Sequence, residues 1–98
     1  MGATIFIGDE LTAAGFRLTG VETMTPGPDA VQQALRDARQ RAALVIITAS
    51  FSLRLPSPEL EAALLAEEPI VTVVSDVLSR VRPPDLARRL RIALGIEI

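Results

Sequence analysis

The chain has 98 residues, of which 49% are hydrophobic and 22% are charged, and its net charge at pH 7 is −2. This length suits one domain with its own core, and the composition is that of a globular chain rather than a disordered one. A slightly acidic chain lacks the strongly basic surface that nucleic-acid binding generally needs. We therefore expect a single domain over residues 1–98 that does not bind nucleic acid.

Several residue types that carry chemistry are missing from the chain. It has no Cys, His, Tyr or Trp, and all ten basic residues are Arg, so Lys is missing too. These gaps exclude thiolate and imidazole metal ligands, an imidazole proton shuttle, a Schiff-base lysine and the phosphate-binding lysine of nucleotide loops. We therefore expect no catalytic residues, no cofactor and no metal site.

No segment approaches the roughly 20 apolar residues that a membrane-spanning helix needs. The N-terminus also lacks a basic region ahead of an apolar stretch, which a secretory signal would have. We expect an intracellular protein that does not insert directly into a membrane.

The first apolar run and the helical pattern after it open the chain. Residues 3–8 are rich in β-branched side chains and too short for a helix, so they predict a buried strand. Residues 9–20 predict a helix with Asp9 as its N-cap and Gly20 at its C-terminal turn. Four apolar positions of this helix share one face, which we expect to pack on the sheet: Leu11, Ala14, Gly15 and Leu18.

The middle of the chain repeats this alternation. Residues 20–24 predict an edge strand, and residues 26–42 predict a second helix with arginines near its end, where the helix dipole favours them. Residues 43–48 are apolar throughout, as expected of a central parallel strand that is covered on both faces.

The last part of the chain holds three helical patterns and one strand. Residues 50–57 predict a short helical turn, and residues 57–68 a longer helix capped by Ser57. Residues 69–75 predict the fourth strand, and residues 83–94 a final helix. Strands that alternate with helices predict a single small doubly wound α/β domain of flavodoxin or receiver type, with a four-stranded parallel sheet of order 2-1-3-4 and helices on both faces.

The acids Asp9 and Glu10 follow the first strand, at the edge where α/β folds collect ligand-handling residues. A receiver-like domain would hold Mg²⁺ there, but Thr48 stands where its phosphate-accepting Asp is needed. Rossmann, Walker and G-x-S-x-G motifs are also missing. We therefore interpret Asp9 as a helix cap, Ser50 as another cap and Asp76 as a turn residue. Metal or small-ligand binding by Asp9 and Asp76 is the alternative.

Residues 7–21, IGDELTAAGFRLTGV, resemble the start of the F subunit of prokaryotic V/A-type ATP synthases. In that family the first strand runs into the pattern G-D-x-x-T-x-x-G-F-R-L-x-G-[VI]. The chain matches it at Gly8, Asp9, Thr12, Gly15, Phe16, Arg17, Leu18 and Gly20. The resemblance extends over essentially the full length, to a closing ALGIEI at residues 93–98.

The resemblance implies a non-catalytic subunit of the central stalk that turns with the rotor. Such a subunit binds the coiled-coil D subunit and couples ATP chemistry in the A/B catalytic head to ion transport through the membrane ring. Its further neighbours are the head and the connector subunit of that ring, and its C-terminal region can modulate ATP hydrolysis. The resemblance also implies a cytoplasmic location, peripheral to the plasma membrane, as part of the soluble V1/A1 portion.

Physical arguments give several matched residues an expected role. Gly15 should let the first helix lie close to the sheet, and Gly20 should supply a left-handed turn. We expect Phe16 to pack toward the last helix, and Arg17 to hold a neighbouring carboxylate or carbonyl. For Phe16 and Arg17, roles within the chain are favoured over direct contact with a partner.

The last helix, about residues 84–94, is the expected partner-binding and regulatory element. One face should pack on the sheet: Leu86, Leu90, Ala93 and Leu94. Arg88, Arg91 and Ile92 lie elsewhere around the helix, and arginine stems and forks suit interfaces. The hypothesis is that these three residues face the stalk partner; the alternative is a solvated helix surface.

Overall fold

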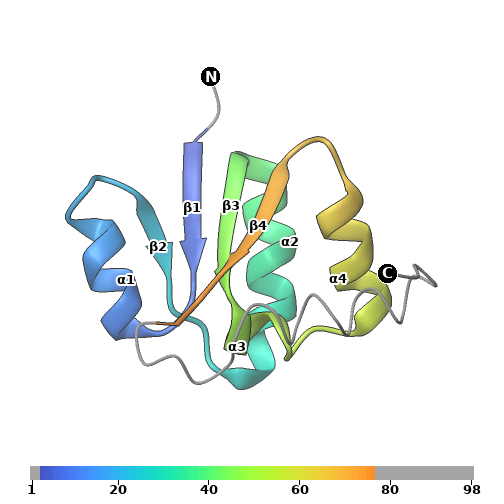
Figure 1. The fold of residues 1–98 in the computed structure, drawn as a ribbon, viewed down its shortest axis with the longest axis horizontal. Helices are drawn as coiled ribbons and strands as arrows, with labels where there is room; N and C mark the ends of the chain where they lie inside the picture. The colour runs from blue at the N-terminus through green and yellow to red at the C-terminus, as the bar shows by residue number, and fades with distance from the viewer. Residues whose placement is uncertain (1–2, 77–98) are drawn as a thin grey trace.

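The computed structural model describes residues 3–76, which form a four-stranded parallel sheet in the order β2-β1-β3-β4 (Figure 1). The strands are β1 (Ala3–Ile7), β2 (Glu22–Met24), β3 (Ala42–Thr48) and β4 (Ile70–Val74). The helices are α1 (Glu10–Arg17), the 3-10 turn η1 (Pro28–Ala30), α2 (Val31–Arg41), α3 (Ala49–Ser52) and α4 (Ser57–Leu65). The predicted α/β class, parallel sheet and strand order are confirmed. The predicted final helix at residues 83–94 lies outside the described residues.

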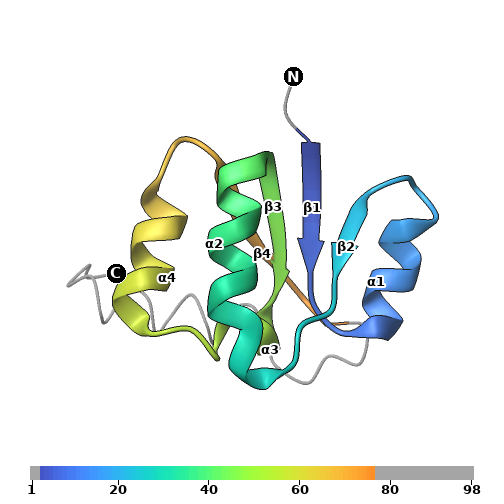
Figure 2. The same cartoon turned by 180° about the vertical axis from the view of Figure 1, so that it is seen from behind.

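The alternation of side chains along each strand divides the sheet into two faces. On one face, residues at odd positions of β1, β3 and β4 form the main core, among them Ile5, Val45 and Val71. Helices α2 and α4 cover this face, as Figure 2 shows, and contribute Leu35 and Leu60 to the same cluster. Each fully buried side chain of this kind stabilises the fold by about 1.5–3 kcal/mol. This face therefore provides most of the apolar burial in the described part of the chain.

Helix α1 packs on the opposite face of the sheet, over β1 and β2. Its inner residues are Thr12, Ala13 and Phe16, and the ring of Phe16 stacks on Phe6 with centroids 4.6 Å apart. The prediction that the leucine stripe packs on the sheet is therefore wrong. The physical reason is Phe6, whose ring projects from β1 on this face and draws the aromatic side of α1 inward. Phe16 contacts the sheet, and the last helix, toward which the sequence predicts it to pack, lies outside the described residues.

The glycines of the N-terminal motif serve different purposes in the structure. Gly20 has a positive φ of 86°, so the predicted left-handed turn is confirmed. Gly8 is buried, and a Cβ at this position would lie 2.5 Å from Phe6 Cζ and 2.6 Å from Thr48 Cγ2. Gly15 faces open space, with no atom within 4 Å of the place that a Cβ would take. The expectation that Gly15 brings α1 close to the sheet is therefore wrong.

Two helix starts also differ from expectation. The predicted helix of residues 26–42 starts later than expected. Its first turn is the 3-10 turn η1, and the α-helix α2 begins only after it. Helix α4 has Pro56 at its N-cap position and no side-chain cap hydrogen bond, so the predicted capping by Ser57 is wrong. Prolines fix the backbone at this start instead, because their restricted φ suits the first turn of a helix.

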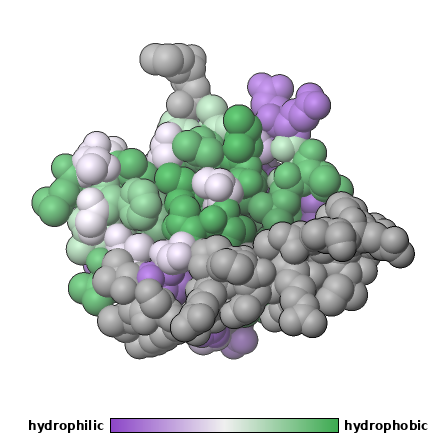
Figure 3. Space-filling view, in the orientation of Figure 1, coloured by the Kyte–Doolittle hydropathy of each residue, from purple (hydrophilic) through white to green (hydrophobic). Residues whose placement is uncertain are grey.

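The α1 side of the sheet is apolar over β3 and β4 as well. Residues at even positions there include Leu44, Ile46 and Val74, which are partly exposed, and Ile70, which is 57% exposed. Figure 3 shows this face with apolar atoms over the middle of the sheet. Among the described helices, α1 is the one that lies on this face, and it packs on β1 and β2.

Candidate partner-binding surfaces

Asp9 begins α1 at the carboxyl edge of the sheet. Its Oδ2 accepts a hydrogen bond from the Thr12 backbone N–H at 3.0 Å, and its Oδ1 accepts one from the Thr12 hydroxyl at 2.7 Å. An N-cap of this kind stabilises a helix by about 0.5–2 kcal/mol. The prediction that Asp9 caps the first helix is confirmed, and it explains why the motif pairs Asp9 with Thr12.

Asp76 follows β4 at the same edge and is 6% exposed. Its carboxylate accepts hydrogen bonds from the Ser50 backbone N–H at 3.2 Å and from the Ser50 hydroxyl. Asp76 therefore holds the start of α3 to the end of β4. The prediction of Ser50 as a cap is wrong, because Ser50 lies inside α3 and Thr48 takes the N-cap position. The residues that would form a turn after Asp76 lie outside the described part of the chain. Ser50 and Asp76 are 26 positions apart, so only the tertiary fold brings this donor and acceptor together.

The carboxyl edge gives no positive support to the alternative of a ligand site at Asp9 and Asp76. Within residues 3–76, no group of three or more acidic, His or Cys side chains is placed to hold a metal ion. Thr48, at the position where a receiver would carry its phosphate-accepting Asp, is fully buried, with its methyl group near Gly8. The described side chains of this edge serve helix starts and strand packing.

Arg17 ties the end of α1 to its neighbours. Its Nη1 pairs with the Glu10 carboxylate at 3.0 Å, and its Nε and Nη2 donate to the Thr23 hydroxyl at 3.1 and 2.9 Å. Phe16 is engaged with Phe6 on the sheet. The structure thus gives Arg17 and Phe16 contacts within the chain, as expected from the sequence.

The solvent side of α1 carries two further residues of the motif, Gly15 and Leu18, together with Leu11 and Ala14. This outer α1 face consists of Leu11, Ala14, Gly15 and Leu18. Leu11 is 56% exposed and Leu18 is 89% exposed, whereas the two positions between them are small. The spacing i, i+3, i+4, i+7 lines up these residues along the helix, so the face carries two exposed leucines with two small residues between them. It suits a helix that approaches closely at Ala14 and Gly15.

The sequence offers no local signal that the outer α1 face is exposed, because its period equals that of a buried stripe. Its exposure follows from the placement of Phe16 on Phe6. The other predicted partner-binding residues, Arg88, Arg91 and Ile92, lie outside the described residues. Across residues 3–76, no helix combines the length and the apolar character that a membrane crossing requires.

Comparison with known proteins identifies the family. The model of the family described as ATP synthase (F/14-kDa) subunit matches residues 5–89, which include the last three residues of β1, all of β2 to β4 and the N-terminal motif. A search of curated proteins found no match. The family match covers most of the chain, and it agrees with the N-terminal motif and with the parallel sheet. The chain therefore belongs to the family of the F subunit of V/A-type ATP synthases.

Proposed function

We propose that this chain is a non-catalytic rotor subunit of the central stalk, which binds the coiled-coil D subunit and couples ATP hydrolysis or synthesis in the A/B head to ion transport. The observation that carries the proposal is the family match over residues 5–89. The proposal also includes the membrane-ring connector subunit as a neighbour, modulation of ATPase activity by the C-terminal region, and a cytoplasmic position peripheral to the plasma membrane in the V1/A1 portion.

The surface chemistry of the described residues supports a binding role. Leu11 and Leu18 expose apolar area on α1 that serves no packing within residues 3–76, and Ile70 exposes more on the sheet. Clustered exposed apolar side chains are typical of protein interaction sites. A coiled coil presents long helices, and the exposed apolar residues of the outer α1 face have the spacing of a surface that packs against another helix.

The direct test is to mix the purified full-length chain with the coiled-coil D subunit of the same genome. Size-exclusion chromatography with light scattering should show one complex of 1:1 stoichiometry at micromolar concentration. Mg²⁺ titration of the isolated chain distinguishes the receiver-like alternative, because a metal that binds the folded state raises its thermal stability. Two separate peaks with the D subunit, together with a Mg²⁺-dependent rise in melting temperature, would overturn the stalk proposal in favour of the ligand-binding one.

A further inference from the structure

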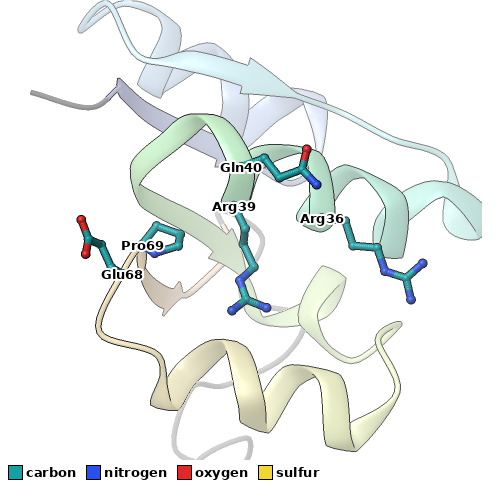
Figure 4. Close-up of a pocket in the computed structure, with 5 residues that line it drawn as sticks. All are labelled: Arg36, Arg39, Gln40, Glu68 and Pro69. Atoms are coloured by element: carbon teal, nitrogen blue, oxygen red, sulfur yellow. The ribbon is translucent and has the colours of Figure 1, made fainter.

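A pocket lies at the amino-terminal edge of the sheet, where α2 ends and the loop before β4 returns. It has a volume of about 360 Å³ and is lined by Arg36, Arg39, Gln40, Glu68 and Pro69 (Figure 4). Asp9 and Asp76 follow the opposite, carboxyl ends of strands β1 and β4, so the pocket is separate from them. No expectation from the sequence points to this pocket.

Arg39 stands apart from the other arginines of the described part of the chain. Four of the five have a partner there: Arg17 with Glu10, Arg36 with Glu59 at 3.0 Å, Arg41 with Glu22 at 2.7 Å, and Arg54 over the Phe51 ring at 5.5 Å. Arg39 has no carboxylate, hydrogen-bond acceptor or aromatic ring as a partner within residues 3–76. A half-buried guanidinium without a partner is uncommon and calls for an explanation.

The burial of Arg39 holds its charged group in a defined place. Its Nε is shielded from solvent without an acceptor, whereas Nη1 and Nη2 are not among the shielded atoms. In Figure 4 the guanidinium extends from α2 toward α4, and the Glu68 carboxylate points away from it on the far side of Pro69. The two terminal nitrogens therefore form a fork that an external acceptor can reach.

The charges around the pocket select the kind of anion that fits. Arg36 is neutralised by Glu59, which leaves Arg39 as the one unpaired positive charge among the described pocket residues and Glu68 as a negative charge on the rim. The carboxyl end of α2 adds the partial negative charge of the helix dipole. A doubly charged phosphate is disfavoured in these surroundings. A single planar carboxylate matches the two N–H groups of the fork in both charge and geometry.

We propose that the Arg39 pocket receives a carboxylate side chain, Asp or Glu, presented by the subunit that binds this chain. The identity of that subunit rests on the proposed function, whereas the carboxylate specificity rests on the pocket alone. Pairing with a carboxylate supplies the acceptor that Arg39 lacks and adds a directional contact to an interface whose other described surface, the outer α1 face, is apolar.

The pocket itself is tested with sodium acetate as the probe, on the full-length chain and with sodium chloride at matched ionic strength as the reference. The Nε–H signal of Arg39, assigned by its loss in Arg39→Lys, should shift saturably in two-dimensional NMR spectra, and the signal of Arg54 should not. Equal shifts of both signals would overturn the carboxylate site, whether or not a partner subunit binds.

The source of the carboxylate is tested by isothermal titration with the D subunit. Arg39→Gln should weaken binding by about tenfold or more, as expected for the loss of a charged hydrogen-bonded contact. The matched control Arg54→Gln should stay within about twofold of the wild-type chain, since Arg54 is already engaged with Phe51. Equal affinity of both variants would show that no carboxylate of the coiled coil occupies the pocket. Failure of the wild-type chain to bind would instead contradict the proposed function, and the acetate titration would still decide the pocket.

Discussion

Gly8 and Asp9 are adjacent in the motif but act by different physical means. Asp9 contributes an acceptor at the start of α1, where backbone N–H groups lack partners within the helix. Gly8, directly after β1, has no side chain, and the space that a Cβ would take is filled by the Phe6 ring and the Thr48 methyl group. Both residues are therefore explained within the chain, without a ligand at the carboxyl edge of the sheet.

Gly8→Ala should destabilise the protein by about 1–3 kcal/mol, the usual cost of forcing an extra carbon into a packed core. The new Cβ would lie 2.5 Å from a ring carbon of Phe6, which is itself fully buried. Urea denaturation at neutral pH measures this loss in the free energy of unfolding. The matched control is Gly27→Ala, since Gly27 has a φ of −66° and open space around it. Equal stability of Gly8→Ala and the control would contradict the packing described here.

The ion pair between Glu22 and Arg41 gives the protein a small pH-dependent stability. The hydrogen bond from Arg41, aided by its positive charge, holds the pKa of Glu22 below its ordinary value of 4.5. The contribution of this pair is therefore fully present above pH 4.5 and is lost as the pH falls through the lower pKa of the folded state. Both side chains are exposed, so solvent screens the pair and the effect is small.

Glu22→Gln should thus lower the melting temperature slightly at pH 7, and the difference from the wild-type chain should shrink as the pH falls below 4.5. Thermal denaturation followed by circular dichroism at several pH values measures this difference. Glu67→Gln is the control, because Glu67 is exposed and has no ion pair within residues 3–76. A gap between Glu22→Gln and wild type that stays constant with pH would contradict the assignment.

At the scale of elements, the two sides of α1 make different contacts. The inner side packs on the sheet through Phe16, and Asp9 caps the start of the helix. Its outer side keeps an exposed glycine in the middle of a helix, which costs about 0.5–1 kcal/mol relative to alanine. No contact within the described residues requires that glycine, which is why we connect it with the approach of a partner helix.

Gly15→Ala should therefore raise the free energy of unfolding by about 0.5–1 kcal/mol, because alanine is the better helix former. The same change should weaken binding to the D subunit, because the added methyl group takes up space between Leu11 and Leu18 that a partner helix would otherwise approach. Leu18→Asp should weaken binding more and leave the fold intact, since Leu18 is 89% exposed. Denaturation and isothermal titration measure the two quantities separately.

The control for this pair of variants is Leu65→Asp at the end of α4. Leu65 is 66% exposed, comparable to the residues tested, but it lies on the opposite side of the molecule from α1 (Figure 1). Its substitution should not change the affinity for the D subunit. If Leu18→Asp and Leu65→Asp both bound as tightly as the wild-type chain, the outer α1 face would not be the binding surface.

The strand order and the parallel sheet could be predicted because each strand is a short apolar run and each connection is long enough for a crossover helix. The orientation of α1 could not be predicted from periodicity, because this short helix carries apolar residues on two sides. Which of these two sides packs on the sheet depends on Phe6, which stacks on Phe16. The side of the sheet on which Phe6 lies follows only from the assembled fold.

Contacts between distant parts of the chain could likewise not be predicted from local sequence patterns. Asp76 and Ser50 are 26 positions apart and meet because the ends of β4 and β3 are neighbours in the sheet. The lack of a partner for Arg39 within residues 3–76 is also a tertiary property, because Glu59 of α4 pairs with Arg36 and the Glu68 carboxylate points away from Arg39 (Figure 4). The predicted roles of Arg88, Arg91 and Ile92 stay predictions, because these residues lie outside the described part.

At the scale of the whole molecule, the surfaces described here suit a component of a larger assembly. Apolar side chains are exposed on the outer side of α1 and on β4. Arg39, unpaired within residues 3–76, lines a pocket at the amino-terminal edge of the sheet. Family membership over residues 5–89 supplies the kind of assembly, a V/A-type ATP synthase. In the function proposed above, this chain turns with the rotor of that assembly.

The most direct measurement of that role is single-molecule rotation. A head complex of the A, B and D subunits is immobilised, and the chain is labelled at a single cysteine introduced as Leu65→Cys, which is unique because the chain has no cysteine of its own. Upon addition of ATP, the label on a rotor subunit should rotate continuously in one direction and stop when ATP is removed. A label that binds the complex but stays stationary during ATP hydrolysis would contradict the rotor assignment.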